Sequence, residues 1–193
     1  MHPRRLLPAL LLFVVAAAGF ADPATRQRGA LLARAAGRQV GVTTQYDPSY
    51  VRLAYPGGDV PLDRGVCADV VVRAFRAIGV DLQVEVHRDM QRNFSAYPRN
   101  WGLTSPDRNI DHRRVPNLMR YFERQGKRLS LDGAYEPGDV VAWRLPNGLH
   151  HIGVVAAGRV PRESRPYVVH NIGAGTQKED VLYAFEIIGH YRW

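Results

Sequence analysis

The sequence predicts an α+β domain, with helices in its first part and an antiparallel sheet at its C-terminal end. Apolar residues recur at helical spacing in segments that end by Gly126. Beyond Gly133 the pattern changes to short runs of β-branched and aromatic residues, separated by Gly and Pro. Helices followed by consecutive strands are typical of this class. The chain has 193 residues, of which 46% are hydrophobic and 23% charged, so we expect one globular domain.

The N-terminus is typical of a signal peptide for export. Arg4 and Arg5 precede an apolar run of about 15 residues, and Gly19 and Ala21 supply small side chains before a cleavage point. The run is shorter than the roughly 20 residues that span a bilayer. We therefore expect residues 1–21 to be removed and residues 22–193 to form a single periplasmic or secreted domain without a stable membrane span. An uncleaved membrane anchor is the alternative.

The first part of the domain contains four predicted helices joined by polar loops. Residues 81–94 alternate like a strand around Val84, but the stripe of Leu82, Val86 and Met90 favours a helix. Residues 43–66 are rich in turn-forming residues and are expected to be loop with short extended pieces, and residues 95–114 are expected to be a long polar loop. Each of the first, second and fourth helices ends at a glycine. The predicted helices span residues 25–41, 67–79, 81–94 and 115–126.

The predicted sheet is made of short strands that follow one another along the chain. Their β-branched and aromatic content and the turns between them favour antiparallel pairing. The strand segments are "DVVAW", "HIGVVAA", "YVVHN" and "AFEIIGHYRW".

Cys67 is the single cysteine of a chain that carries an export signal. An unpaired cysteine in such a protein is a buried small hydrophobe, an intermolecular crosslink or a reactive thiolate. The predicted helix begins at Cys67, and a helix N-terminus presents free N–H groups and partial positive charge. This position lowers a thiol pKa and favours a nucleophile.

Two histidines on neighbouring strands are candidates for the base that a thiol nucleophile needs. His151 begins the second predicted strand and His170 lies near the end of the third. If these strands form a hairpin, both rings lie on one face, and His170 can orient His151 as the third member of a triad does. Asn171 points to the other face; it is the reserve for that role and a candidate substrate-binding residue.

The order of these residues resembles a known superfamily. The chain is similar to the NlpC-type, papain-like cysteine peptidases of bacterial cell walls in the order of four features. These are a Cys at a helix start, "PGDVVAW", "HHIGVV" and a strand ending in His. The resemblance implies a papain-like fold, with the nucleophile helix packed on the sheet, and Cys67, His151 and His170 as the catalytic residues. Tyr55 in "AYPGGDVP" is the loose counterpart of that superfamily's upstream tyrosine, which makes it the candidate substrate-binding side chain of the oxyanion hole. The segment "Val-Cys-Ala-Asp" replaces the usual "Asp-Cys-Ser-Gly".

Four segments carry a closer resemblance to a family of exported bacterial proteins of unknown function, grouped with that superfamily. They are "GVCADVVVRAFRAIGVDLQ", "PDRNIDHRRVPNL", "PGDVVAW" and "HNIGAG".

The loop that contains His112, Arg113 and Arg114 has two interpretations. It is an Asx-rich loop that caps the following helix, or its cations flank the cleft and bind substrate carboxylates, which suit the bidentate guanidinium group. Asp69, in the first turn of the Cys67 helix, is expected to stabilise the helix dipole. The sequence contains no "H-E-x-x-H" motif and no paired cysteines, so we expect no metal and no cofactor.

The expected function is hydrolysis of amide bonds in peptidoglycan stem peptides through a Cys-His-His acyl-enzyme mechanism. The alternative is a catalytically idle module of the same fold that binds cell-wall peptides or an envelope partner. Transfer of the acyl group to an amine instead of water also stays open. The net charge of +8 either attracts anionic envelope polymers or reflects a generally basic composition. Without Lys/Arg runs or aromatic-basic interleaving, no nucleic-acid partner is expected.

Overall fold

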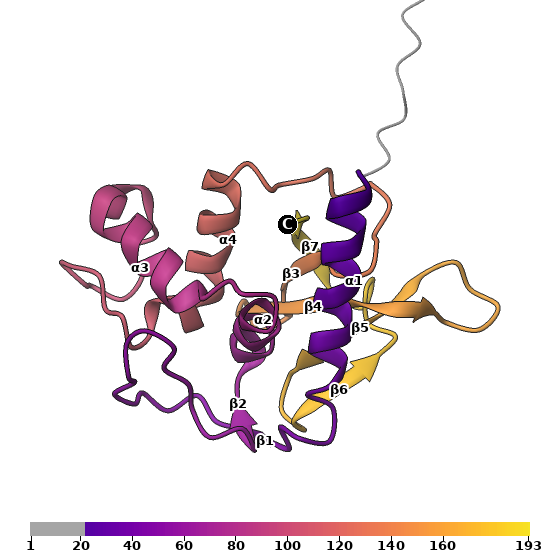
Figure 1. Cartoon of the computed structure of the whole chain (residues 1–193), viewed down its shortest axis with the longest axis horizontal. Helices are drawn as coiled ribbons and strands as arrows, with labels where there is room; N and C mark the ends of the chain where they lie inside the picture. Colours follow the sequence, from indigo (N-terminus) through magenta and orange to yellow (C-terminus); the bar gives the residue numbers. More distant parts are fainter. Residues whose placement is uncertain (1–21) are drawn as a thin grey trace, which may run out of the picture.

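The computed structural model describes residues 22–193, so the predicted signal peptide at 1–21 lies outside the described residues. The α+β class is confirmed, with four helices preceding and packing on a five-stranded antiparallel sheet (Figure 1). Two single-turn 3₁₀ helices, η1 (Phe94–Ala96) and η2 (Asp111–Arg113), lie between α3 and α4. Within the described residues no helix is both long and apolar enough to span a bilayer. The α-helices are α1 (Pro23–Gly37), α2 (Cys67–Arg76), α3 (Leu82–Asn93) and α4 (Val115–Arg124).

Helix α1 ends at Gly37, four residues before the predicted end at Gly41. The turn that follows Gly37 is tighter than an α-helix, since the N–H groups of Gln39 and Val40 donate to the carbonyls three residues before them. At its middle, α1 meets the turn before β3 so closely that a Cβ on Gly29 would lie 2.5 Å from the carbonyl oxygen of Pro137. The two backbones can therefore touch only because this position is glycine.

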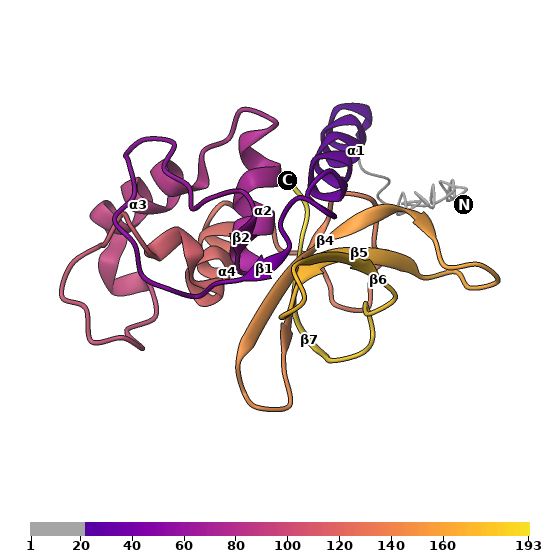
Figure 2. The same ribbon diagram turned by 90° about the horizontal axis from the view of Figure 1, so that it is seen from below.

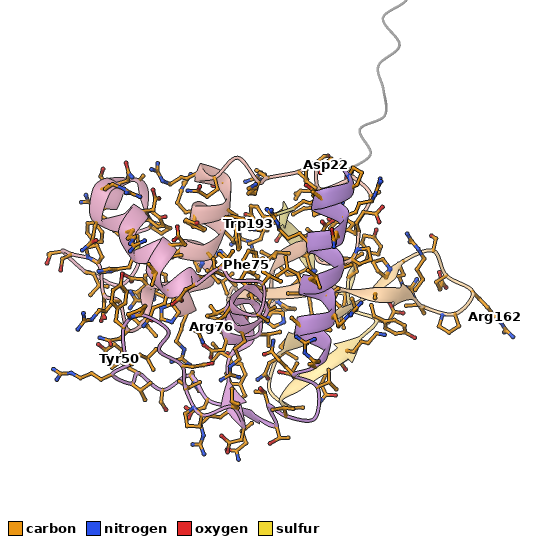
Figure 3. All side chains as sticks on the ribbon, viewed as in Figure 1. Asp22, Tyr50, Phe75, Arg76, Arg162 and Trp193 are labelled. Carbon is orange, nitrogen blue, oxygen red and sulfur yellow. The ribbon has the colours of Figure 1, made fainter. Side chains whose placement is uncertain are left out.

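The other helices begin where the sequence predicts or one residue later. Helix α2 is buried over nearly its whole length, and Phe75 packs against Trp193 at the C-terminus, with ring centroids 5.5 Å apart (Figure 3). The ambiguous segment 81–94 is helical, because Leu82, Val86 and Met90 all bury on one face of α3. Asp81 caps that helix by accepting the N–H of Gln83.

The sheet has the strand order β6-β5-β4-β3-β7, and every neighbouring pair is antiparallel. Figure 2 shows the helices over one face and loops over the other. The sequence did not predict β6, because short exposed strands carry little apolar signal. The two-residue parallel pair β1 (Gln45–Tyr46) and β2 (Arg64–Gly65) lies in the segment expected to contain short extended pieces. The sheet strands are β3 (Val140–Arg144), β4 (His150–Arg159), β5 (Pro166–Asn171), β6 (Thr176–Glu179) and β7 (Glu186–Tyr191).

The strand register assigns each residue of the sheet to one of two cores. Ala142 pairs with Ile152 and Val154 pairs with Val169, and all four belong to the large core shared with the helices. Trp143 pairs with His151, and Trp143 belongs to the smaller core on the opposite face. Side chains alternate between faces along a strand, so His151 lies on the face away from the helices.

Candidate active site

Cys67 is the first residue of α2, as predicted, and its side chain borders a cleft of about 540 Å³. The residue is only 5% exposed. Asp69 stabilises the start of the helix by accepting the N–H of Val66 at 2.7 Å. The cleft is lined by Tyr46, Pro48, Val66, Cys67, Asn100, Trp101, Ile110, Arg113, Val115, Pro116, Gly148, Leu149 and His150.

The sulfur of Cys67 meets the sheet at a fork between β4 and β5. Recorded pairs between these strands begin at Val154 and Val169, so the first residues of β4 have no partner on β5. The N–H of Val155 donates to the carbonyl of Asp139, just before β3. Backbone N–H groups alternate between the two edges of a strand, so the N–H of Ile152, three residues earlier, points toward β5. That N–H instead faces the Cys67 sulfur, one residue beyond His151.

Asn171 holds the α2 start in this fork. Its amide group donates to the carbonyl of Gly65 at 2.9 Å, two residues before Cys67. The side chain is fully buried on the helix-facing side of β5, as the sequence predicted for its face. Its contacts are therefore with the protein backbone, and the substrate-binding role assigned to Asn171 stays a prediction.

The expected proximity of His151 and His170 is confirmed. Nε2 of His151 lies 2.8 Å from Nδ1 of His170, and the two rings meet edge to face. The indole of Trp143 stacks on His151 with centroids 5.4 Å apart, and Trp143 is itself fixed by donating Nε1–H to the carbonyl of Leu182. Two contacts thus fix the orientation of the His151 ring.

Gly153 makes room for this pair. A Cβ at Gly153 would lie 2.9 Å from the carbonyl oxygen of Val169 and 3.1 Å from Cβ of His170. Glycine in the "H-x-G" pattern therefore allows β5 to bring His170 beside His151.

The histidine that lines the Cys67 cleft is His150, the residue directly before His151. His151 lines a second cleft of about 440 Å³, and Tyr46, Leu149 and His150 border both clefts. The hydrogen bonds recorded for residues 22–193 include none between Cys67 and His151. Cys67 and His151 therefore approach the fork from opposite faces of the sheet.

Burial decides the resting protonation of the site. It raises the pKa of the Cys67 thiol to about 12, although the N–H of Ile152 acts in the opposite direction. Burial, with a smaller contribution from His170, lowers the pKa of His151 to about 3. The thiolate expected at the helix N-terminus is not the resting form, because desolvation outweighs the hydrogen bonds from the backbone N–H groups of Ile152, Ala68 and Cys67. A neutral thiol and a neutral imidazole are present at pH 7.

Arg113 lines the cleft, but its charge is neutralised within the fold. Its guanidinium group forms a buried, bidentate ion pair with Asp69 at 2.8 and 3.0 Å and also donates to the carbonyls of Ser49 and Asp47. The pair ties η2 to the first turn of α2. Asp69 therefore anchors this loop in addition to its expected role at the helix dipole, and substrate binding by Arg113 stays a prediction.

Three other predicted substrate-binding residues lie away from the lining of the Cys67 cleft. His112 is buried, and burial lowers its pKa to about 4. Arg114 pairs with Asp111 at 3.2 Å and lies over the ring of Trp101, behind the cleft wall. Tyr55 packs edge-on against His87 near α3. The structure does not bring these three side chains to the sulfur.

Sequence reasoning missed four residues around the site. Tyr46 and Trp101 lie in segments interpreted as loops, and Trp101 is 41% exposed at the cleft. The pKa of Tyr46 is raised by its partial burial and by Cys67, which places the phenol near the sulfur. Glu179 lies on the unpredicted strand β6, and its carboxylate is 2.9 Å from Nε2 of His170. Only His150, adjacent to His151, carried a usable sequence signal.

Residues 33–193, which include Cys67 and both paired histidines, match the family described as a domain of unknown function, DUF1287. The chain belongs to this family. It is also similar to the uncharacterized protein YijF of Escherichia coli strain K12, with 55% identity over 165 residues that cover 84% of this chain and 80% of YijF. No solved structure matches the chain. The DUF1287 match covers the whole candidate site, from Tyr46 to Glu179, together with α1 from Ala33 onward.

This DUF1287 chain offers chemistry based on a thiol. Among residues 22–193 no group of three His, Cys, Asp or Glu side chains is placed to hold a metal ion. The groups that border the fork are a thiol and backbone N–H donors at a helix start on one face of the sheet, and an imidazole pair on the other face. This set suits nucleophilic attack on a carbonyl carbon.

Proposed function

We propose that the protein is an exported cysteine hydrolase of the NlpC-type, papain-like superfamily that cleaves amide bonds in peptidoglycan stem peptides. The observation that carries this proposal is the fork between β4 and β5. There the Cys67 sulfur meets the N–H next to His151, and His151 is hydrogen-bonded to His170 through Nε2. Because Nε2 is occupied, Nδ1 is the nitrogen of His151 left to act as the base.

The reaction starts from the neutral pair. Sγ of Cys67 attacks the carbonyl carbon while the thiol proton moves to Nδ1 of His151, so the thiolate exists only during attack. The carbonyl oxygen gains negative charge and accepts hydrogen bonds from the free N–H at the start of α2 and from the hydroxyl of Tyr46, which replaces Tyr55 in this role. His151 then gives the proton to the leaving amine. Water hydrolyses the thioester and regenerates the thiol.

Substrate contacts are assigned to the walls of the cleft. Trp101 and Tyr46 provide exposed aromatic surface, and Asn100 provides an amide that pairs with peptide groups. This lining suits an extended peptide of mixed polarity. An exported enzyme meets such amides in the stem peptides of the cell wall, which supports peptidoglycan as the substrate and a periplasmic or secreted location.

A second function is a catalytically idle module that binds cell-wall peptides or an envelope partner in the same cleft. The observations that favour it are the burial of Cys67, which raises its thiol pKa to about 12, and the position of His151 on the other sheet face. A binding module needs the cleft and its aromatic residues but not the thiol.

Purified peptidoglycan separates the two functions. The wild-type protein and the Cys67→Ser and His151→Ala variants are incubated with sacculi, and soluble products are identified by mass spectrometry. Hydrolysis predicts new free amino and carboxyl groups from the wild type only. Equal release by wild type and Cys67→Ser refutes the thiol mechanism, and sedimentation of all three proteins with sacculi without any product supports the binding module.

A further inference from the structure

Glu179 gives the His151–His170 pair a third member on the outside of the sheet. It ends β6, where it pairs in register with Val168, so it shares the sheet face of His170. Its carboxylate oxygen Oε2 lies 2.9 Å from Nε2 of the neutral His170 ring, a contact without the direction of a regular hydrogen bond. His170 is 1% exposed, whereas the Glu179 side chain is 47% exposed and reaches in from the solvent.

Nε2 of His170 has no other partner among the described residues. A buried ring N–H needs an acceptor, and an ionised carboxylate can only accept. The groups that face the His170 ring are Glu179 from β6, His151 from β4 and the indole of Trp143 from β3. Lys178 points elsewhere, because its ammonium group lies over the ring of Tyr167.

We propose that Glu179 is a positioning residue that sets the tautomers of both histidines and so keeps Nδ1 of His151 free to accept a proton. The tautomer assignment does not depend on the proposed hydrolase function; only the role of Nδ1 as the base in catalysis rests on it. Glu179 holds the His170 proton on Nε2, which leaves Nδ1 of His170 as an acceptor. Nε2 of His151 must then donate to it across the 2.8 Å contact. The remaining nitrogen of a neutral His151, Nδ1, carries the lone pair.

The two histidines alone do not fix this direction. Their 2.8 Å contact is equally satisfied when His170 carries its proton on Nδ1 and donates to Nε2 of His151. His151 is then protonated on Nδ1 and has no lone pair there to accept the thiol proton. Burial keeps both rings neutral, since it lowers the pKa of His151 and is the largest influence lowering that of His170. One exposed carboxylate therefore selects the productive arrangement.

The test compares two near-isosteric substitutions. Glu179→Met removes the acceptor at similar side-chain length, and Glu179→Gln keeps a carbonyl oxygen. Glu186→Met is the matched control, because Glu186 is an exposed strand glutamate paired with Arg144 at 3.2 Å and lies on β7. Imidazole ¹⁵N NMR of the labelled, folded protein reports which ring nitrogen carries the proton, with His151 and His170 assigned by His→Gln variants.

The wild type and Glu186→Met are expected to show Nε2–H for both histidines. Glu179→Met is expected to move both protons to Nδ1 in part or in full, and Glu179→Gln to restore most of the wild-type signal. Unchanged tautomers in Glu179→Met overturn the inference, as does a shift of equal size in Glu186→Met. The spectrum needs no substrate, so it decides the tautomer question even if the hydrolase proposal fails.

Activity on peptidoglycan fragments gives the second readout. Loss of the correct tautomer is expected to lower kcat by about 10- to 100-fold, which is at most the lower end of the 10²–10⁴ that a positioned base contributes. KM should be unchanged, and Glu179→Gln should restore kcat. A raised KM at constant kcat contradicts the positioning role. If the wild type forms no product while the tautomers shift as expected, the tautomer assignment stands and the hydrolase proposal is refuted.

Discussion

Gly153→Ala tests how closely the sheet is fitted around the histidine pair. The added methyl group would lie 2.8 Å from Cγ1 of Val168, 2.9 Å from the carbonyl oxygen of Val169 and 3.1 Å from Cβ of His170. The Val168 side chain can rotate, but the carbonyl and the Cβ are backbone-fixed, so β5 must shift. Overpacking of this kind lowers the free energy of unfolding by about 1–3 kcal/mol.

Gly37→Ala is the matched control. Gly37 is the last residue of α1, and a Cβ built there meets nothing within 4 Å. Alanine at such a site is neutral or adds about 0.4–1 kcal/mol by restricting the unfolded chain. The free energy of unfolding is therefore expected to fall in Gly153→Ala and to stay the same or rise in Gly37→Ala.

Urea unfolding of both variants, followed by circular dichroism, measures the difference. The imidazole ¹⁵N spectrum of Gly153→Ala should also show a weakened contact between His151 and His170, because the shift acts directly on β5. If Gly153→Ala unfolds at the same urea concentration as the wild type, the close approach of Gly153 to β5 is wrong.

Three further predictions follow from buried charges and from the thiol. Arg113→Met leaves the Asp69 carboxylate buried without its cation, so the free energy of unfolding should fall by about 3–5 kcal/mol in the urea assay. Arg120→Met breaks an exposed pair with Glu123 and should change that free energy by less than about 1 kcal/mol. Between pH 6.5 and 4 the wild type should lose about 3 kcal/mol more stability than His112→Gln, because the unfolded histidine takes up a proton that the native one, with its pKa lowered to about 4 by burial, does not. Iodoacetamide should alkylate folded Cys67 at pH 7 about a thousandfold more slowly than the urea-unfolded chain, and the rate should still rise with pH at pH 10, because burial raises the thiol pKa to about 12.

Each of these has a clear contrary result. Equal effects of Arg113→Met and Arg120→Met would show that the Asp69 contact carries no stability. Parallel pH curves for wild type and His112→Gln would mean that His112 titrates normally in the folded state. Fast alkylation at pH 6 would show that Cys67 is ionised at rest and that the helix N-terminus outweighs burial.

The helices and most strands could be predicted from the sequence, since their apolar patterns are strong. The stripe of Leu82, Val86 and Met90 settled an ambiguous segment as helix, and the hairpin logic brought His151 to His170. The end of α1 was missed because a turn of tightened 3₁₀ bonds leaves no sequence mark. Strand β6 was missed because its residues are polar and mostly exposed.

The site was only partly predictable, because contacts between distant segments decide it. Arg113 has the chemistry of a substrate-binding cation, but 44 residues separate it from Asp69, which neutralises it. Tyr55 was chosen as the counterpart of the superfamily's upstream tyrosine, whereas Tyr46, more distant from Cys67 in sequence, reaches the cleft through the β1–β2 pairing. The helix position of Cys67 indicated a thiolate, but burial, which sequence does not reveal, opposes it.

The adjacent histidines at the start of β4 provide the most direct test of the central claim, that the Cys67 thiol is activated by His151 across the fork. Product release from purified peptidoglycan is measured by mass spectrometry for the wild type, His151→Ala and His150→Ala. We predict that His151→Ala abolishes release while His150→Ala retains at least about a tenth of it, since only His151 is oriented by His170. Full activity of His151→Ala, or loss of activity only in His150→Ala, would contradict the account.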